Sequence, residues 1–448
     1  MTKQKLSFHK SRRQELLKLI TTRSHAPAWE RKNDSLILIF GSTFKHKSYD
    51  YDYPLKQNRN FFYLTGFEEP NSALLLAPAG IKVSSGKNKF KTVKEILFVQ
   101  QNDKSREVWT GKRLGFENVN SELGIEYGQV NTEIMNFLTT NLTPQINKLY
   151  INIPEFYALT GEMKRIVMDL YEKLHTMTPN IQLIDVNYLI GKMRFVKTDF
   201  EIIEMKRSAD ICVNAFEDAI TQVRAGMYEF QIQSVLEYNY KSYGAMDVAF
   251  DTIVASGNNA CTLHYETNQD ILKNGDLVLI DSGAEYNGYN SDITRTVPVS
   301  GKFSKEQKEI YNLVLKVQKD VINKIKPGIK LTDLKTYTKD ALAKGLLKLE
   351  IIKKKEEIIK YYMHGVGHHL GLDTHDAVKT NGEYDILKPG NIITVEPGIY
   401  IAKGSDAPKK YQGIGVRIED DILVTKTGND VLTSGLAKEI DEIEKMIL

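Results

Sequence analysis

The 448-residue sequence has little cysteine and little net charge: it contains two cysteines, Cys212 and Cys261, and its formal net charge is +3. Two cysteines cannot build a disulfide framework, which excludes a disulfide-rich secreted domain and favours a reducing compartment. So small a charge does not indicate a nucleic-acid partner. No apolar run reaches the roughly 20 residues of a membrane-spanning helix, and the basic start MTKQKLSFHKSRRQELLKLI lacks the apolar stretch of a signal peptide. We therefore expect a cytoplasmic protein that binds neither nucleic acid nor membranes.

The first part of the chain has the pattern of an α/β domain. The length predicts about two or three domains, and the pattern of elements divides the chain near residue 195. Before that point, helical segments near 131–141 and 157–175 mix with apolar, strand-like runs, which are SLILIF, SALLLAP, KEILFVQ, KLYINI and IQLIDV. We find no catalytic motif in residues 1–194, so we expect residues 195–448 to carry the site.

The second part predicts an α+β domain. Thr198 and Glu201 form a capping box for a helix that extends to about Val223, and a second helix ends near Gly244. Ser304 with Gln307 caps a third helix, which ends before Pro327-Gly328, and a fourth covers 331–348. Strand hairpins lie between these helices in blocks, which is typical of antiparallel sheets with helices grouped on one side.

Five metal-type ligands occur in this second part. They are Asp281, Asp292, His368, Glu396 and Glu419, within the segments LVLIDSGAEYNGYNSDITRT, HGVGHHLGLDTHD, TVEPGIY and GVRIEDD. Four carboxylates and one imidazole make a hard, oxygen-rich set, which suits a pair of Mn²⁺, Co²⁺ or Zn²⁺ ions better than a single structural zinc. Enzymes use two such metal ions together to hydrolyse amides and phosphates.

The two aspartates are predicted to share one face of a hairpin. Asn287-Gly288 is the strongest short hairpin signal, a type I′ turn. With this turn Asp281 faces Thr294 and Asp292 faces Gly283, so the aspartates become diagonal neighbours, roughly 7–8 Å apart at Cα. Two carboxylates facing a core require a positive charge between them. The alternative is a pair of exposed strand carboxylates on a solvated face.

A second candidate hairpin carries Glu396 and Glu419. The strand-like segments IITVEPGIYI and GIGVRIEDDILVT flank a polar loop over 403–412. Pro397 cannot donate to a ladder, so a strand end, edge or bulge lies beside Glu396. Arg417 and Glu419 are two residues apart and face the same way. Alternatively, Glu-Pro-Gly is only a turn and Arg417 only an ion-paired surface residue.

Histidines are concentrated around the glycine-rich segment HGVGHHLG. His364, His368, His369 and His375 lie in or just after it, and His264 precedes the first aspartate. Repeated glycine is unfavourable within a helix, whereas it lets the backbone approach a ligand closely. The segment therefore indicates a site.

These motifs resemble the aminopeptidase P (Xaa-Pro aminopeptidase) branch of the pita-bread metallopeptidase family, which also includes prolidase and methionine aminopeptidase. The resemblance covers almost the whole chain, including RRQELLKLI, QNRNFFYLTGFEEP, EVWTGKRLG and DITRTVPVSGKFSKEQKEIYNLVL. It implies an α+β fold: a C-terminal pita-bread domain with a curved antiparallel sheet, preceded by an N-terminal α/β (ribonuclease H-like) domain.

The resemblance also implies a role for each site residue. Two divalent ions, most often Mn²⁺, would be held by Asp281, Asp292, His368, Glu396 and Glu419. Glu396 would also orient and deprotonate the bridging water. His264 would contact the substrate, His375 would donate to the peptide carbonyl, Arg417 would support the site, and His364 would lie close to it.

Two departures from the family pattern concern the same segment. His369 stands where an aromatic residue is common, and Thr374 stands where valine is usual. The histidine leaves open which of two adjacent imidazoles is the ligand, although the spacing within the motif favours His368.

The implied activity is release of the first residue from peptides with proline at the second position, by attack of a metal-bridging hydroxide. Prolidase, which cleaves Xaa-Pro dipeptides, is the alternative within the enzyme class, and methionine aminopeptidase usually lacks so large an N-terminal domain. Some relatives that have lost the metal-ligating residues act as peptide-binding modules, and others, such as creatinase, catalyse their reaction without metal. The complete set of five ligands argues against both.

Assembly is implied as well. Relatives use the N-terminal domain for subunit contacts, so we expect a homodimer or homotetramer. Trp109, in EVWTGKRLG, resembles a tryptophan that reaches a neighbouring subunit's site, although an ordinary packed aromatic is an equal alternative. We also expect Asp50 and Asp52 to approach Arg417.

Overall fold

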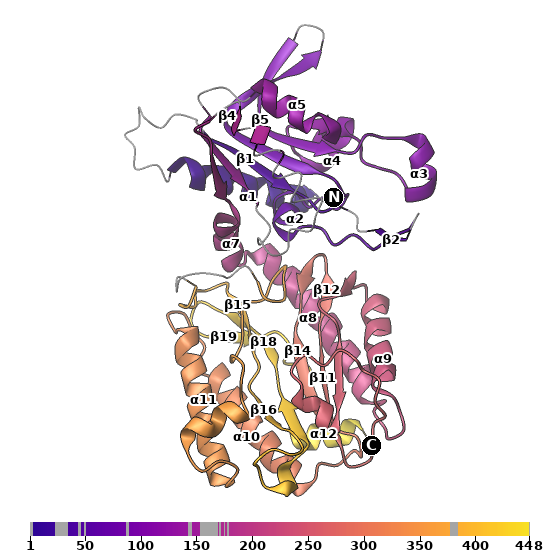
Figure 1. Cartoon of the computed structure of the whole chain (residues 1–448), viewed down its shortest axis with the longest axis vertical. Helices are drawn as coiled ribbons and strands as arrows, with labels where there is room; N and C mark the ends of the chain where they lie inside the picture. Colours follow the sequence, from indigo (N-terminus) through magenta and orange to yellow (C-terminus); the bar gives the residue numbers. More distant parts are fainter. Residues whose placement is uncertain are drawn as a thin grey trace. The chain divides into compact units, whose positions relative to one another are not determined.

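The structure is a computed structural model (Figure 1). It describes residues 3–22, 35–43, 46–48, 51–86, 89–141, 146–152, 169, 172–173, 175–176, 179–376 and 384–447. The chain divides into two compact units, Met1–Met193 and Arg194–Leu448. Among the described residues, none of the helices combines the length and the apolarity that crossing a bilayer demands.

A six-stranded mixed sheet forms the core of the N-terminal unit. Its strand order is β6 (Tyr127–Val130), β5 (Lys89–Val99), β4 (Ala73–Gly86), β1 (Ser35–Phe40), β7 (Lys148–Ile151) and β8 (Gln182–Asp185). β5, β4 and β1 pair antiparallel, whereas β6, β7 and β8 join in parallel. The five predicted apolar runs correspond to β1, β4, β5, β7 and β8. The first four bury their leucine and isoleucine side chains, whereas Leu183 and Ile184 of β8 are half-buried.

Helices and short strands complete this unit. They are α1 (Lys3–Thr22), α2 (Arg59–Thr65), α3 (Lys104–Thr110), α4 (Val119–Leu123), α5 (Ile134–Asn141), β2 (His46–Ser48), β3 (Tyr51–Asp52) and most of α7 (Asn187–Phe195), whose last two residues belong to the second unit. α5 confirms the helix predicted near 131–141. Most of the helix predicted over 157–175 lies outside the described residues. The mixture of helices and a partly parallel sheet confirms the α/β class.

The helices predicted for the C-terminal unit are confirmed. They are α8 (Asp199–Ile220), α9 (Glu229–Ser242), α10 (Lys305–Ile322) and α11 (Leu331–Lys348), followed by α12 (Ile440–Met446). Both predicted capping boxes are present, with the side chain of Thr198 or Ser304 accepting from the backbone three residues on. α8 ends slightly before the predicted Val223.

Every strand pair in the C-terminal unit is antiparallel. The strands are β9 (Asp247–Val248), β10 (Ile253–Ser256), β11 (Leu277–Ser282), β12 (Ala284–Tyr286), β13 (Tyr289–Asn290), β14 (Ile293–Pro298), β15 (Ile392–Val395), β16 (Gly398–Ile401), β17 (Ile414–Arg417), β18 (Asp420–Val424) and β19 (Asn429–Val431). In Figure 1, α9 lies at one edge of these strands and α11 at the other. The α+β prediction is therefore confirmed.

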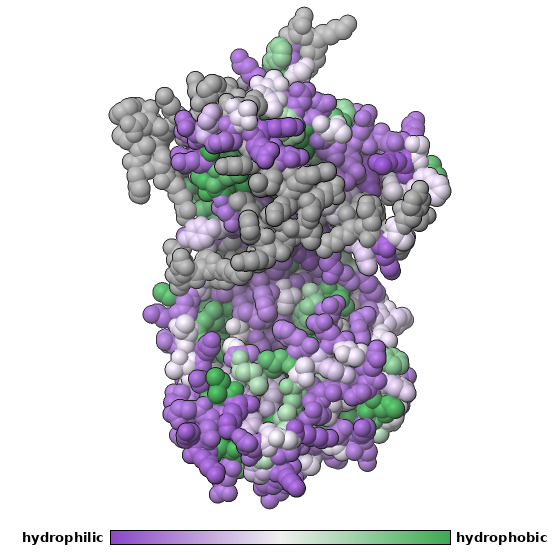
Figure 2. Space-filling view, viewed as in Figure 1, coloured by the Kyte–Doolittle hydropathy of each residue, from purple (hydrophilic) through white to green (hydrophobic). Residues whose placement is uncertain are grey.

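One continuous apolar core joins these helices and strands. It includes the inward faces of α8, α10 and α11 and the strands that carry the predicted site residues. Figure 2 shows that hydrophilic side chains cover most of the visible face of the C-terminal unit, where hydrophobic ones are gathered in small separate groups. The strands are thus fixed by packing, so their polar side chains have little freedom to move.

Candidate active site

The first hairpin has the predicted register. Asp281 is paired with Thr294, and Tyr286 with Tyr289 across the turn. Asn287 and Gly288 have φ angles of 50° and 85°, the positive values that a type I′ turn requires. Asp281 is 8% exposed and Asp292 is 4% exposed, which excludes the alternative of a solvated strand face.

The second hairpin places Glu396 opposite Glu419. β15 pairs with β18 through Val395 and Asp420, and β16 pairs with β17 through Gly398 and Arg417. These two ladders continue one register across a break at Glu396-Pro397, the position at which the proline predicted a strand end. The carbonyl of Pro397 accepts from the Ile418 N–H at 3.4 Å, which keeps the two chains together through the break.

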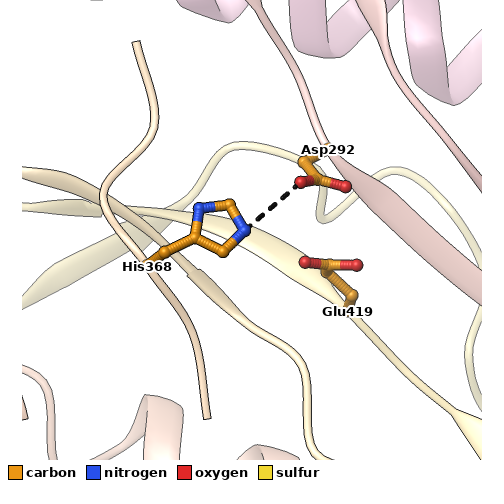
Figure 3. A group of neighbouring side chains, drawn as sticks. All are labelled: Asp292, His368 and Glu419. Atoms are coloured by element: carbon orange, nitrogen blue, oxygen red, sulfur yellow. Dashed lines mark ion pairs between the residues drawn. The ribbon is translucent and has the colours of Figure 1, made fainter. Parts of the chain in front are cut away.

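His368 lies between the two hairpins. Its Nε2 is 3.6 Å from Asp292 Oδ2 and 3.8 Å from Glu396 Oε1. Ligand atoms of Asp292, His368 and Glu419 all lie within 4.8 Å of one another, and Figure 3 shows the three side chains pointing toward a common space. His369 is directed elsewhere: its Nε2 lies 3.2 Å from the Tyr384 carbonyl oxygen. The geometry therefore favours His368 as the ligand.

All nine predicted site residues line one cavity of about 550 Å³. They are His264, Asp281, Asp292, His364, His368, His375, Glu396, Arg417 and Glu419. The sequence did not single out several other lining residues, which are Phe250, Asp251, Ile253, Leu263 and Glu266. They are isolated apolar or acidic residues without a motif, so only their position in space reveals them.

The cavity holds more negative charge than its protein surroundings neutralise. Burial, and then the neighbouring Glu419 and Asp281, raise the pKa of Asp292 well above its usual value. Burial likewise raises the pKa of Glu419, and it raises the pKa of Glu396 to about 8 although Arg417 opposes the shift. Among the described residues, no hydrogen bond reaches the buried Asp281 Oδ1. Buried carboxylates with such unmatched oxygens are a donor set that fits divalent cations.

Arg417 is the principal positive group beside the cluster. Its guanidinium, 3% exposed, donates to the Asp281 carboxylate, to the Tyr400 hydroxyl at 3.0 Å and to Thr294 Oγ1 at 3.1 Å. Thr294 in turn donates to Glu419 Oε2 at 2.6 Å. The burial of Arg417 excludes the alternative of an ion-paired surface residue. The contacts of Arg417 and Thr294 hold the carboxylates of Asp281 and Glu419 in place. Thr294 and Tyr400 were missed as site residues because hydroxyl groups in strands carry no sequence signal.

His364, His368 and His375 face the cavity in neutral form. His364 Nε2 lies 2.8 Å from the Tyr400 hydroxyl, and its Nδ1 lies 3.5 Å from Glu396 Oε2. Burial lowers the pKa of His364 to about 4 and that of His368 to about 3. The rings of His368 and His375 are 4.1 Å apart, and burial also lowers the pKa of His375. A neutral imidazole can coordinate a metal ion or donate a single N–H.

Two predictions concern the N-terminal unit and stay predictions. Trp109 lies in α3 and is 88% exposed, so it is not a packed core aromatic within its own chain. Asp50 lies outside the described residues, and Asp52 belongs to the N-terminal unit, whereas Arg417 belongs to the C-terminal unit. An approach of either aspartate to Arg417 therefore remains untested.

Comparison with known proteins supports the same assignment. Residues 203–426 match metallopeptidase family M24, and residues 9–150 match the N-terminal domain of aminopeptidase P. The Xaa-Pro aminopeptidase of Escherichia coli (strain K12) is 36% identical over 430 residues, which cover 92% of this chain and 94% of that relative.

Solved structures agree with this result. Aminopeptidase P from E. coli with the inhibitor Pro-Leu has a TM-score of 0.86 at 33% identity, covering 99% of this chain and 98% of that one. Proline aminopeptidase P II from Yersinia pestis has a TM-score of 0.86 at 35% identity, covering 100% and 99%.

The chain therefore belongs to metallopeptidase family M24. Within that family it is an enzyme of the aminopeptidase P type, with the pita-bread catalytic fold and the matching N-terminal domain that the sequence predicted. Membership of a metallopeptidase family implies a divalent metal, and Asp292, His368 and Glu419 provide a candidate site for it.

Proposed function

We propose that the protein removes the N-terminal residue from peptides whose second residue is proline. The observation that carries this proposal is the cavity in which four carboxylates, four histidines and Arg417 converge, within a chain that resembles Xaa-Pro aminopeptidases over most of its length. A peptide is the substrate class that this family hydrolyses, and a cavity of about 550 Å³ is of the size that binds small ligands.

Two divalent ions, with Mn²⁺ the first choice and Co²⁺ or Zn²⁺ the alternatives, would be held by Asp281, Asp292, His368, Glu396 and Glu419. When bound, such ions supply an activated water and a Lewis acid for the scissile carbonyl. The raised pKa values of the buried carboxylates support this proposal, because a bound dication is what would make several ionised carboxylates compatible with burial.

The side chains around the ligands would carry the proton and the substrate. Glu396, which would be ionised when the dications are bound, would orient the attacking water and accept its proton. His375 would donate an N–H to the carbonyl oxygen as negative charge develops there, and His264 would contact the substrate near the scissile bond. Arg417 would hold Asp281 in place, and His364 would orient Glu396, which its Nδ1 approaches.

The preference for proline has a chemical basis. Proline at the second position makes the scissile bond a tertiary amide with no N–H, so a peptidase that depends on that donor cannot bind it. The related E. coli aminopeptidase P was solved with the inhibitor Pro-Leu, a dipeptide that begins with proline and continues beyond it. This supports a groove that accepts the chain after proline, whereas a prolidase must close around a free carboxylate.

A matched pair of substrates separates the two activities. We expect a higher kcat/KM for Ala-Pro-Ala than for Ala-Pro, with cleavage only at the first bond, and little cleavage of Ala-Ala-Ala. The measurement is steady-state kinetics with Mn²⁺ at saturation. A dipeptide preference of about tenfold, or about 1.4 kcal/mol in transition-state binding, would identify a prolidase instead.

We further propose that the N-terminal unit assembles the enzyme into a homodimer or homotetramer in the cytoplasm. Val108 and Trp109, both in α3, are 83% and 88% exposed, and adjacent exposed apolar side chains of this size are typical of contact surfaces. Cys212 and Cys261 are both free thiols, which agrees with a reducing compartment.

Light scattering tests the assembly. The wild-type protein is expected to have the mass of two or four chains. If Trp109 reaches a neighbouring subunit's site, Trp109→Ala should weaken catalysis and leave the metal content unchanged. A fully active monomer would contradict the proposal.

A further inference from the structure

A second group of buried charges lies beside the loop that carries His375. Asp376 follows His375 directly and is 3% exposed. Its carboxylate accepts from two cations: Lys197 Nζ lies 2.8 Å from Oδ2, and Arg194 Nη2 contacts Oδ1. The same Arg194 nitrogen lies 2.6 Å from Asp373 Oδ2. Segment 373–376 is therefore tied at both ends to two cations that are themselves 4% exposed.

The backbone around Asp376 is closely fitted to its carboxylate. The Asp376 N–H donates to the His369 carbonyl at 2.8 Å, and the Gly371 N–H donates to the Asp373 carbonyl at 3.1 Å. A Cβ atom at position 371 would lie 2.5 Å from Asp376 Oδ2, so the loop closes around the carboxylate only with glycine there. A change in this carboxylate would therefore shift the path of the loop.

The segment that supplies the two cations also packs against His369, the residue after the proposed ligand His368. The ring of Phe195 lies 4.8 Å from the ring of His369 and 4.6 Å from the ring of Tyr384. Both packing and charge thus join residues 194–197 to the chain that follows His368. This combination makes the segment a rigid support.

His375 itself has little support of its own. Its nearest ring neighbour is His368, and within the described part of the chain no hydrogen bond holds its imidazole. The side chain is exposed to the cavity, so its position depends on the backbone that carries it. Although burial alone would raise it, the charges of Arg194 and Lys197 lower the pKa of Asp376 to about 2, so the anchor keeps its charge at neutral pH.

We propose that Asp376, held by Arg194 and Lys197, is a positioning residue that places the His375 imidazole at the scissile carbonyl. This inference rests on the proposed function of His375 as the oxyanion donor. Small displacements of such a donor are costly, because hydrogen bonds to a developing charge act only over a narrow range of distance.

A double-mutant cycle tests the inference. Asp376→Asn keeps the shape of the side chain and removes its charge, and we expect kcat to fall by about 10- to 100-fold, with KM and metal content unchanged. In a His375→Ala background the same substitution should change kcat by less than about twofold, because the group that it positions is gone. Kinetics, metal analysis and Tm are measured for all four proteins.

Two controls separate positioning from general stability. Lys197→Arg keeps the charge and should retain most of kcat, whereas Lys197→Gln should lose it. Glu95→Gln breaks an equally buried pair with Arg13, 3.0 Å apart in the N-terminal unit, and should lower Tm without changing kcat.

The outcomes are distinct. The inference is overturned if Asp376→Asn has wild-type kcat, loses metal together with activity, or lowers kcat equally in both backgrounds. If Asp376→Asn does not fold, the double-mutant cycle is repeated with Lys197→Gln in its place. This variant leaves the ion pair between Arg194 and Asp376 intact. A wild-type kcat for His375→Ala alone would instead contradict the proposed function of His375.

Discussion

Glu419→Ala and Asp292→Ala are expected to lose bound metal and peptidase activity together. Each residue contributes a buried carboxylate to the group that also contains His368, and their ligand atoms lie within 4.8 Å of one another. Removal of one ligand leaves the remaining carboxylates without a shared cation, so metal affinity falls far below the level needed for occupancy. Elemental analysis of the purified variants, with Ala-Pro-Ala hydrolysis in excess Mn²⁺, measures both losses.

A surface carboxylate serves as the matched control. Asp430, with its side chain 47% exposed, pairs with Lys206 at 2.9 Å, away from the cavity. Asp430→Ala should keep both metal and activity. In the wild type, chelation should abolish hydrolysis, and Mn²⁺ or Co²⁺ should restore it. Full activity in rigorously metal-free protein would contradict the metal-dependent mechanism.

The pH dependence of stability and the release of protons on metal binding provide a second test of the same site. Burial raises the pKa of Glu396 from its usual 4.5 to about 8, so folding favours its protonated form when no metal is bound. That contribution to stability is present below about pH 4.5 and is lost as the pH rises through about 8. We expect the Mn²⁺-induced rise in Tm to grow over this range, and Mn²⁺ binding at pH 7 to release protons, measured by calorimetry in two buffers.

Much of the catalytic half could be predicted because its signals are local. The Asn287-Gly288 turn and strand alternation determine which residue Asp281 faces, and Pro397 marks the break beside Glu396. Capping residues likewise mark where helices begin, since a cap involves only one turn of chain. These features need no information about distant contacts, so the sequence is sufficient to place both hairpins.

Other features depend on contacts between distant segments. The choice between His368 and His369 is made by Phe195 and Tyr384, which draw the second ring away from the cavity. Asp376 has the appearance of a loop aspartate until Arg194 is placed beside it, almost two hundred residues earlier in the chain. β6 was missed because YGQV has a single strongly apolar residue, and pairing with β5 decides its conformation.

His375→Ala is expected to keep its metal and lose rate. The imidazole lines the cavity 4.1 Å from the ring of His368, close enough to reach a carbonyl beside the metal site and yet outside the group of ligand atoms around Asp292. Loss of one oxyanion donor typically costs about 2.7–4 kcal/mol, or about 10²–10³ in kcat. His368→Ala is the matched comparison and should lose metal as well as rate, because its Nε2 approaches both Asp292 and Glu396. If metal analysis gives the reverse result, with metal lost from His375→Ala and retained in His368→Ala, the roles of the two histidines are exchanged.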